Sequence, residues 1–227
     1  MSMYLFDGRS FAALLFDMDG TVLNSLEATE RVWARWAVRH GLDARAVVRA
    51  AHGQRAVDSL SRLNIPGMDV IAEAAEVTRM EIEDIEGVRP IAGVREFLGA
   101  LPERGWAIVT SAPRALAERR LAAAGLEPPA ALITAEDVAT GKPDPSGYRL
   151  AASRLGASAA DCVVFEDAVA GIKAGEAAGS KVIVITATHA EPLPTSHPSF
   201  HTFEELRTDV AGRRMQIAIR PAARRAR

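Results

Sequence analysis

An apolar segment that ends abruptly in two carboxylates constrains the fold of this chain more than any other feature. Residues 14–23 read LLFDMDGTVL, so Asp17 and Asp19 lie two positions apart and a glycine follows at once. If residues 13–17 form a buried strand, its two-residue period points both side chains in the same direction, just past the strand's carboxyl end. Ligands of parallel α/β sheets bind at that edge.

The acidic pair has two interpretations. Carboxylates this close repel each other unless a cation lies between them or one carries a proton, which favours a divalent-metal site with one carboxylate free for chemistry. Asp and Gly after an apolar run are also typical of an ordinary surface turn, as in Asp7-Gly8 after Tyr4–Phe6. The tetrapeptide DMDG alone leaves both interpretations open.

Composition excludes several classes of protein. The 227 residues fit one large domain or a core with a smaller insertion, and only 5% are aromatic, so the core must rest on Ala, Val, Leu and Ile. A net charge of −2 argues against a nucleic-acid partner. No apolar run approaches the roughly 20 residues that span a bilayer, and the first residues lack a signal-peptide pattern. We expect a cytoplasmic protein with no membrane partner.

The single cysteine and the basic end of the chain carry no function in this interpretation. Cys162 stands alone, so no intrachain disulfide can form, and its apolar neighbours predict a small buried residue rather than a nucleophile. Residues 220–227 contain four arginines and could contact nucleic acid or phospholipid. We expect instead a disordered, solvated terminus.

Apolar runs of strand length alternate with segments of helical spacing. The runs are Ala13–Asp17, Trp106–Thr110, Ala131–Thr134, Cys162–Glu166 and Lys181–Thr186. Between them, the segment Leu116–Leu121 has helical spacing and is followed by Gly125 as a C-cap. This alternation predicts an α/β fold, a Rossmann-like, doubly wound parallel sheet with helices on both faces.

One block breaks that alternation. Residues 27–88 contain no convincing strand, and Pro90–Gly93 marks the return to the sheet. The helical patterns in the block are Glu27–His40, Ala44–Ala51, Ala56–Leu63 and Val70–Glu86. We therefore expect a small all-helical cap, residues 27–89, inserted into a discontinuous core of residues 11–26 and 90–219. Such a lid excludes water and can move.

Polar residues follow the other predicted strands. Thr110 and Ser111 follow one strand, Lys142 lies in the proline-flanked segment GKPDP, and Glu166-Asp167 ends another. Singly, these are a helix cap, a solvated lysine and a complement to a helix dipole. Because parallel strands end on one rim, together they supply two acidic pairs, a cation and hydroxyl donors. That set suits Mg²⁺ and a phosphate group, with one carboxylate left as nucleophile.

The four motifs, in this order, resemble the haloacid dehalogenase-like superfamily, and specifically its magnesium-dependent phosphatases with a helical cap. The resemblance covers about residues 14–185. It implies that Asp17 attacks phosphorus and that Asp19 first protonates the leaving alkoxide and later deprotonates water. It also implies Mg²⁺ held by the Asp17 carboxylate, the Asp19 main-chain oxygen and Asp167, with Glu166 assisting directly or through water.

The same resemblance assigns the phosphate contacts and narrows the reaction. Ser111 and Lys142, together with Thr110, would neutralise the phosphoryl oxygens. Dehalogenases of the family lack the second acid, so Asp19 argues for phosphate esters. A phosphonate-cleaving relative would need a cap lysine, and residues 27–89 contain none.

The predicted cap offers a finer resemblance. The segments Arg39–Leu42 and Ala51–Arg55 look like the cap of bacterial sugar- and hexitol-phosphate phosphatases, close to yeast glycerol-3-phosphate and 2-deoxyglucose-6-phosphate phosphatases. His52, Gln54 and Arg55 would then contact substrate hydroxyls; a polar interhelical turn is the alternative interpretation. The implied partner is a small phosphorylated metabolite, and we expect a monomer or weak dimer.

Three functions remain open at this point. The leading one is a Mg²⁺-dependent phosphomonoesterase acting on small phosphorylated sugars or polyols. A β-phosphoglucomutase-like phosphosugar mutase would use the same residues and return the phosphoryl group to the sugar. A non-catalytic binding module on the same fold is disfavoured because every chemical position is filled.

Overall fold

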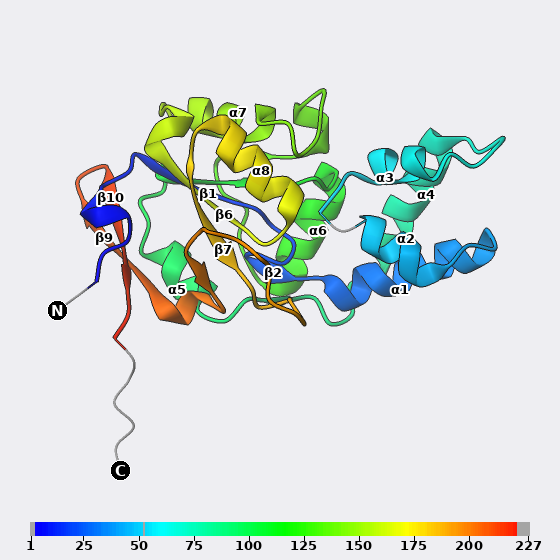
Figure 1. Cartoon of the computed structure of the whole chain (residues 1–227), viewed down its shortest axis with the longest axis horizontal. Coiled ribbons are helices and arrows are strands. Elements are labelled where there is room, and N and C mark those ends of the chain that lie inside the picture. Colours follow the sequence, from blue (N-terminus) through cyan, green and yellow to red (C-terminus); the bar gives the residue numbers. More distant parts are fainter. Residues whose placement is uncertain (1–2, 52, 222–227) are drawn as a thin grey trace, which may run out of the picture.

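A parallel sheet with helices on both faces forms the larger part of the molecule (Figure 1). The computed structural model describes residues 3–51 and 53–221, and in these residues six strands form the sheet, in the order β5-β4-β1-β6-β7-β8. Every neighbouring pair in it is parallel. The strands are β1 (Ala13–Phe16), β4 (Trp106–Val109), β5 (Leu132–Ile133), β6 (Cys162–Glu166), β7 (Lys181–Ile185) and β8 (Ser199–Phe200). The α/β fold class predicted from the sequence is confirmed.

Successive residues of each buried strand face opposite layers. In β1, Leu14 and Phe16 join one apolar cluster, whereas Ala13 and Leu15 join another. The first cluster includes side chains of α5 (Val94–Gly99) and α6 (Arg114–Ala124), and the second those of α7 (Ser146–Arg154) and α8 (Val169–Ala178). A strand buried on both faces must be apolar throughout, which is why these strands are continuous apolar runs.

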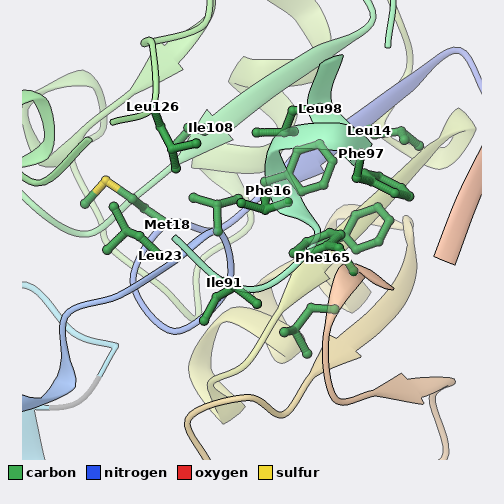
Figure 2. Packing of buried hydrophobic residues seen from close by; sticks show 14 of the residues in the cluster. Leu14, Phe16, Met18, Leu23, Ile91, Phe97, Leu98, Ile108, Leu126 and Phe165 are labelled. Carbon is green, nitrogen blue, oxygen red and sulfur yellow. The ribbon is translucent and has the colours of Figure 1, made fainter. Parts of the chain in front are cut away.

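Aromatic rings anchor the ends of the two central strands. Phe16 at the end of β1 stacks on Phe165 of β6 with 4.6 Å between ring centroids, and Phe97 of α5 packs edge-on against both (Figure 2). Met18 is fully buried in the same cluster. With Met18 held in the core, its neighbours Asp17 and Asp19 are left to line the opposite, polar side of the loop.

Four helices form a unit at one end of the molecule, which we call the helical unit (residues 26–83, Figure 1). They are α1 (Leu26–Arg39), α2 (Ala44–Ala51), α3 (Ala56–Leu63) and α4 (Val70–Glu83). Their apolar faces enclose a separate cluster around Trp36, Leu60 and Val77. The predicted helix ends agree within three residues, and α4 stops early because Asp84 turns extended and pairs with Arg31 of α1. The predicted cap boundaries stay a prediction, which this separate cluster supports.

Both chain crossings into the helical unit belong to a short antiparallel ribbon. Strand β2 (Leu23–Asn24) pairs with β3 (Arg89–Pro90). The main-chain nitrogen of Ile91 extends this pairing by donating to the Val22 carbonyl at 3.0 Å. The sequence patterns did not predict this ribbon.

The C-terminal part of the core forms a hairpin that was also not predicted. Strands β9 (Leu206–Ala211) and β10 (Arg214–Ile219) pair antiparallel, with Tyr4 and Phe11 bridging to β10. Single 3₁₀ turns complete the structure at Phe6–Gly8, Ala135–Asp137, Ala159–Asp161 and Phe203–Glu205. The Arg220 guanidinium donates to the Leu206 carbonyl at 2.6 Å. Residues 222–227 of the predicted basic tail lie outside the described residues.

Two further expectations from the sequence concern burial and membranes. Cys162 is fully buried, and burial raises the pKa of its thiol to about 12, as expected for a packing residue rather than a nucleophile. None of the described helices is long and apolar enough to cross a bilayer.

Candidate active site

The polar residues predicted to meet at one rim of the sheet do meet there. Asp17 follows β1, Thr110 follows β4, and Glu166 ends β6. A cleft opens between this rim and the helical unit. Its lining from the rim includes Asp17, Asp19, Gly20, Thr110, Ser111 and Arg120. The helical unit contributes Thr29, Trp33, Gln54, Thr78 and Glu81 to this lining.

A buried ammonium joins two of these strand ends. The Lys142 Nζ donates to Asp17 Oδ1, and it donates to Glu166 Oε1 at 2.6 Å. Burial alone would lower the pKa of Lys142, but the two carboxylates outweigh burial and raise it above its usual value. The lysine is therefore held as a cation beside Asp17, from a loop whose two prolines limit its backbone freedom.

Three carboxylates lie close enough to share one cation. Oxygen atoms of Asp17, Glu166 and Asp167 all lie within 4.8 Å of one another, and all three residues are buried. Burial raises the pKa of Asp17 well above its usual value; Lys142 opposes that shift and the neighbouring carboxylates add to it. A divalent cation among these oxygens would favour their ionised forms, so the donor set fits a hard, oxygen-binding metal.

Two glycines leave room for these carboxylates. Gly20 has a φ of +89°, and a Cβ there would overlap the Asp167 carboxyl group. A Cβ at Gly171, in α8, would overlap the carboxyl group of Glu166. A side chain at either position would displace a carboxylate of the acidic cluster, which is why both positions need a glycine.

The side chain of Asp19 lies apart from that cluster. Its Oδ1 accepts from Ser25 Oγ at 2.5 Å and from Arg120 Nη1 at 3.0 Å. Asp19 therefore lines the cleft without joining the three carboxylates that lie together. The Asp19 carboxylate is therefore not one of the oxygens that lie together in that cluster.

The two hydroxyl residues after β4 differ in their contacts. Thr110 is buried, and its Oγ1 accepts from the main-chain nitrogen of Ala112 at 3.0 Å. Ser111 Oγ donates to the carbonyl of Gly53, in the turn after α2, at 3.2 Å. Both residues line the cleft, and Ser111 reaches across it to the helical side.

Of the three predicted substrate contacts of the cap, the structure describes Gln54 and Arg55, and these two side chains have different partners. Gln54 lines the cleft, and its Oε1 accepts from Arg62 at 3.1 Å. Arg55 pairs with Asp58 at 2.7 Å and donates to the carbonyl of Ala139, so it braces the Lys142 loop. His52 lies outside the described residues.

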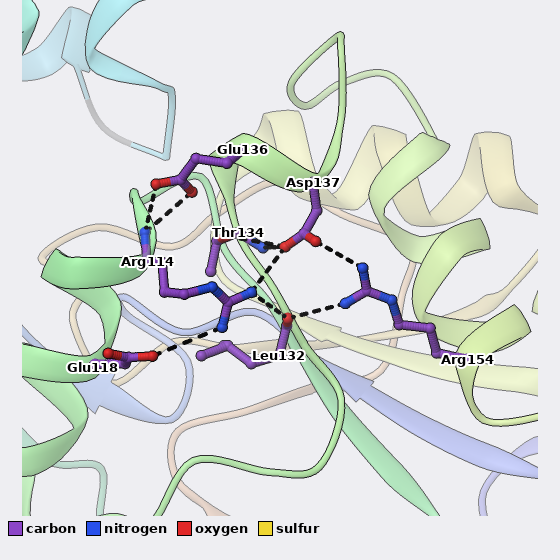
Figure 3. Close-up of polar contacts among 7 residues, drawn as sticks. All are labelled: Arg114, Glu118, Leu132, Thr134, Glu136, Asp137 and Arg154. Atoms are coloured by element: carbon purple, nitrogen blue, oxygen red, sulfur yellow. Dashed lines mark hydrogen bonds and ion pairs between the residues drawn. The ribbon is translucent and has the colours of Figure 1, made fainter.

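A polar network fixes the start of the Lys142 loop (Figure 3). Asp137 accepts from the main-chain nitrogen of Thr134 at 2.8 Å, and it pairs with Arg154 of α7 at 2.7 Å and Arg114 of α6 at 3.2 Å. Burial alone would raise the pKa of Asp137, but the hydrogen bonds from Thr134 and the charge of Arg154 outweigh burial and lower the pKa to about 2. Two helices on opposite faces of the sheet therefore converge on one carboxylate beside β5.

Several residues that contact the acidic cluster or Asp19 were not predicted from the sequence patterns. Tyr148 donates from its hydroxyl to Glu166 Oε1 at 2.7 Å, and Arg120 connects Asp19 to Glu81 of α4. His189 lies 4.0 Å from the Asp167 carboxylate. A tyrosine on the buried face of the α7 segment was the one usable hint, because a buried hydroxyl needs a partner. The other residues depend on how distant elements pack.

Comparisons with known proteins give the family and the fold of the chain. The family model described as haloacid dehalogenase-like hydrolase matches residues 11–179. Hexitol phosphatase A of Escherichia coli is 41% identical over 182 residues, covering 78% of this chain and 84% of the relative. Glycerol-1-phosphate phosphohydrolase 2 of Saccharomyces cerevisiae is 34% identical and covers 78% and 75%. The fold matches the crystal structure of CbbY from Rhodobacter sphaeroides in complex with phosphate (TM-score 0.73, 21% identity, 86% and 96% covered).

Proposed function

The chain belongs to the haloacid dehalogenase-like hydrolase family, and on that premise we propose that it is a Mg²⁺-dependent phosphatase of small phosphorylated sugars or polyols. One observation carries the proposal. The buried Asp17 carboxylate lies against the Lys142 ammonium and two further carboxylates, while Asp19 lines the same cleft separately. A nucleophile, a cation for the phosphoryl oxygens, a metal-binding cluster and a separate acid are thus present together.

The first half of the reaction transfers the phosphoryl group to the protein. A bond forms between an Asp17 carboxylate oxygen and phosphorus, and the bond from phosphorus to the ester oxygen breaks. Asp19 in its protonated form gives its proton to that ester oxygen, so the alcohol leaves neutral. Lys142 and the Ser111 hydroxyl donate to the non-bridging oxygens and stabilise the charge that develops on them.

The second half of the reaction regenerates the Asp17 nucleophile. Asp19, now ionised, takes a proton from a water molecule as the water oxygen bonds to phosphorus. The bond between phosphorus and Asp17 breaks, which releases inorganic phosphate, frees the Asp17 carboxylate and leaves Asp19 protonated, as at the start. One acid serves both steps because it needs to lose in one step the proton that it gains in the other.

Mg²⁺ is the metal that we assign to the acidic cluster. The carboxylates of Asp17 and Asp167 would hold it with the Asp19 main-chain oxygen, and Glu166 would contribute directly or through water. When bound, the ion supplies positive charge beside the phosphoryl oxygens. Two or more carboxylates and a main-chain oxygen form the all-oxygen donor set that Mg²⁺ prefers.

The charge of the cleft supports a neutral, hydroxyl-rich leaving group. Among the described residues that line it, the only cationic side chain is Arg120, and it is already bound to Asp19 and Glu81. Beyond the phosphate group, a substrate meets hydroxyls and a carboxylate that accept hydrogen bonds from alcohols. A substrate with a second phosphate or a carboxylate would place that negative group near Glu81, with no further cation to pair with it, and the two negative charges would repel each other.

The mutase is the second candidate, with less support. It would use the same Asp17 and Asp19 but would have to keep water from the phosphorylated protein while the sugar rebinds. Interconversion of glucose 1-phosphate and glucose 6-phosphate, without release of phosphate, would establish it.

We further propose that the protein is a monomer or weak dimer in the cytoplasm, and that its partner is a small phosphorylated metabolite.

The function is tested with a panel of phosphate esters and one matched pair of variants. Purified protein with Mg²⁺ is assayed for phosphate release from hexitol, hexose, pentose and glycerol phosphates, and from phosphoglycolate as an acidic comparison. We expect turnover of the polyol and sugar esters and poor turnover of phosphoglycolate. Asp17→Asn should abolish release, whereas Asp7→Asn, at an exposed turn far from the cleft, should leave it unchanged. Full turnover by Asp17→Asn would overturn the mechanism.

A further inference from the structure

Arg120 connects the loop after β1 with helices α1 and α4, above the rim of the sheet. It lies in α6 with only 6% of its side chain exposed. Its Nη1 donates to Asp19 Oδ1 at 3.0 Å. Its Nη2 donates to Glu81 Oε1 of α4 and to Thr29 Oγ1 of α1, both at 2.9 Å. A buried guanidinium is therefore bound at one end to the core and at the other to the helical unit.

The two carboxylate oxygens of Asp19 differ in the number of hydrogen bonds that they accept. Both Ser25 and Arg120 donate to Oδ1. In residues 3–51 and 53–221, no hydrogen bond or ion pair is found at Oδ2. A carboxylate held through one oxygen by two donors presents the other to the cleft, in a fixed direction.

We propose that Arg120 is a positioning residue that decides which oxygen of Asp19 exchanges the proton with substrate. By occupying Oδ1, it leaves Oδ2 as the atom that gives the proton to the ester oxygen and takes one from water. Because its planar fork is fixed at its far side by Glu81 and Thr29, the direction of Oδ2 follows from the packing of α1 and α4 on the core. This inference rests on the proposed phosphatase activity.

The test compares two leaving groups. An alkyl phosphate such as a hexitol phosphate needs a proton on its departing oxygen, whereas the p-nitrophenolate of p-nitrophenyl phosphate leaves without one. The value of kcat/KM covers the steps up to loss of the alcohol, so it isolates the proton donation. Arg120→Met keeps the length of the side chain and removes its donors. Arg119→Met is the control, an exposed arginine on the same helix that contacts the Ile82 carbonyl of α4 but not Asp19.

We expect Arg120→Met to lower kcat/KM for the hexitol phosphate on the order of 10- to 100-fold, as loss of oriented acid catalysis does. The value for p-nitrophenyl phosphate should fall less than about 3-fold, because no proton transfer is lost. With p-nitrophenyl phosphate the variant should also release a burst of one equivalent of nitrophenol, since Asp19 must still activate water in the second step. Arg119→Met should match the wild type on both substrates.

Two further variants guard against a purely structural effect. Arg120→Lys keeps a buried cation, and it should fold and show the same bias toward the nitrophenyl ester. In an Asp19→Asn background, Arg120→Met should cost no further activity if it acts through Asp19. Equal losses on both substrates in the folded variants, or additive losses in the double variant, would overturn the positioning role. A wild-type protein that releases phosphate from neither ester would instead overturn the proposed function.

Discussion

The ammonium of Lys142 and the carboxylate of Asp17 form an ion pair that is buried at the rim of the sheet, with 7% and 10% of the side chains exposed. Lys142 reaches this position from a loop braced at Arg55 and Asp137, and its charge is shared with Glu166. The carboxyl groups of Asp17, Glu166 and Asp167 and the ammonium of Lys142 are thus packed together, almost fully buried. Removing one charge from such a cluster leaves the opposite charges buried without a partner, which lowers the free energy of unfolding. Substitutions in the cluster should therefore have measurable effects.

Removing the Lys142 charge should affect both stability and turnover. Lys142→Met leaves Asp17 and Glu166 buried without their cation, so we expect the free energy of unfolding to fall by about 3 kcal/mol in the absence of metal. Millimolar Mg²⁺ should restore part of that loss, and phosphate release should be abolished. Urea unfolding with and without Mg²⁺ measures the effect. Lys173→Met, on the exposed face of α8, is the control, and equal stability of the two variants would contradict the prediction.

The Asp137 network should make stability depend on pH in a defined range. Its folded pKa is about 2 and its usual value is 3.8. Because the folded value is the lower one, the stabilisation is complete above about pH 4 and is lost as the pH falls toward 2. Asp137→Asn should therefore cost about 1 kcal/mol at neutral pH, after allowance for solvent screening.

Chemical unfolding of wild type and Asp137→Asn at a series of pH values tests this prediction. The difference in unfolding free energy between the two proteins should shrink as the pH is lowered from 5 to 3. A difference that stays constant over that range would show that the carboxylate charge is not what stabilises the loop.

A methyl group at Gly171 should disturb the acidic cluster. Gly171→Ala forces the Glu166 carboxyl group away from Lys142 and Tyr148, so phosphate release should fall about 10-fold or more and the Mg²⁺ concentration for half-maximal activity should rise. Gly99→Ala, where nothing lies within 4 Å of the added atom, should leave both unchanged. Mg²⁺ titrations of activity on the three proteins provide the measurement, and an unaltered titration of Gly171→Ala would contradict the assignment of Glu166.

Much of the sheet and of its polar rim could be predicted because both depend on local patterns. Buried parallel strands are continuous apolar runs, so β6 (Cys162–Glu166) was predicted with the bounds that it has. The residues after the strands were expected together because parallel strands end on one side. The predicted family is confirmed, while the individual roles of Asp17, Asp19 and Lys142 stay predictions.

The features that were not predicted have different physical causes. The β9–β10 hairpin does carry a signal, since Met215, Ile217 and Ile219 alternate with other residues after the Gly212 turn, but that pattern was not used. Arg120 had no such signal. A charged residue in a helix is normally solvated, and only the meeting of α6 with the helical unit buries it.

The ribbon of β2 and β3 has a mechanical consequence. Because Leu23 and Asn24 are hydrogen-bonded to the returning strand, the two crossings form one double-stranded hinge rather than two independent tethers. The main-chain nitrogen of Gly20 donates to the Leu23 carbonyl at 2.7 Å, so the turn that carries Asp19 is continuous with that hinge. Asp17, by contrast, is fastened to the sheet through its nitrogen and the Phe165 carbonyl. Asp17 and Asp19 are near neighbours in the chain, yet one is anchored to the central sheet and the other to the ribbon that joins the helical unit to the core.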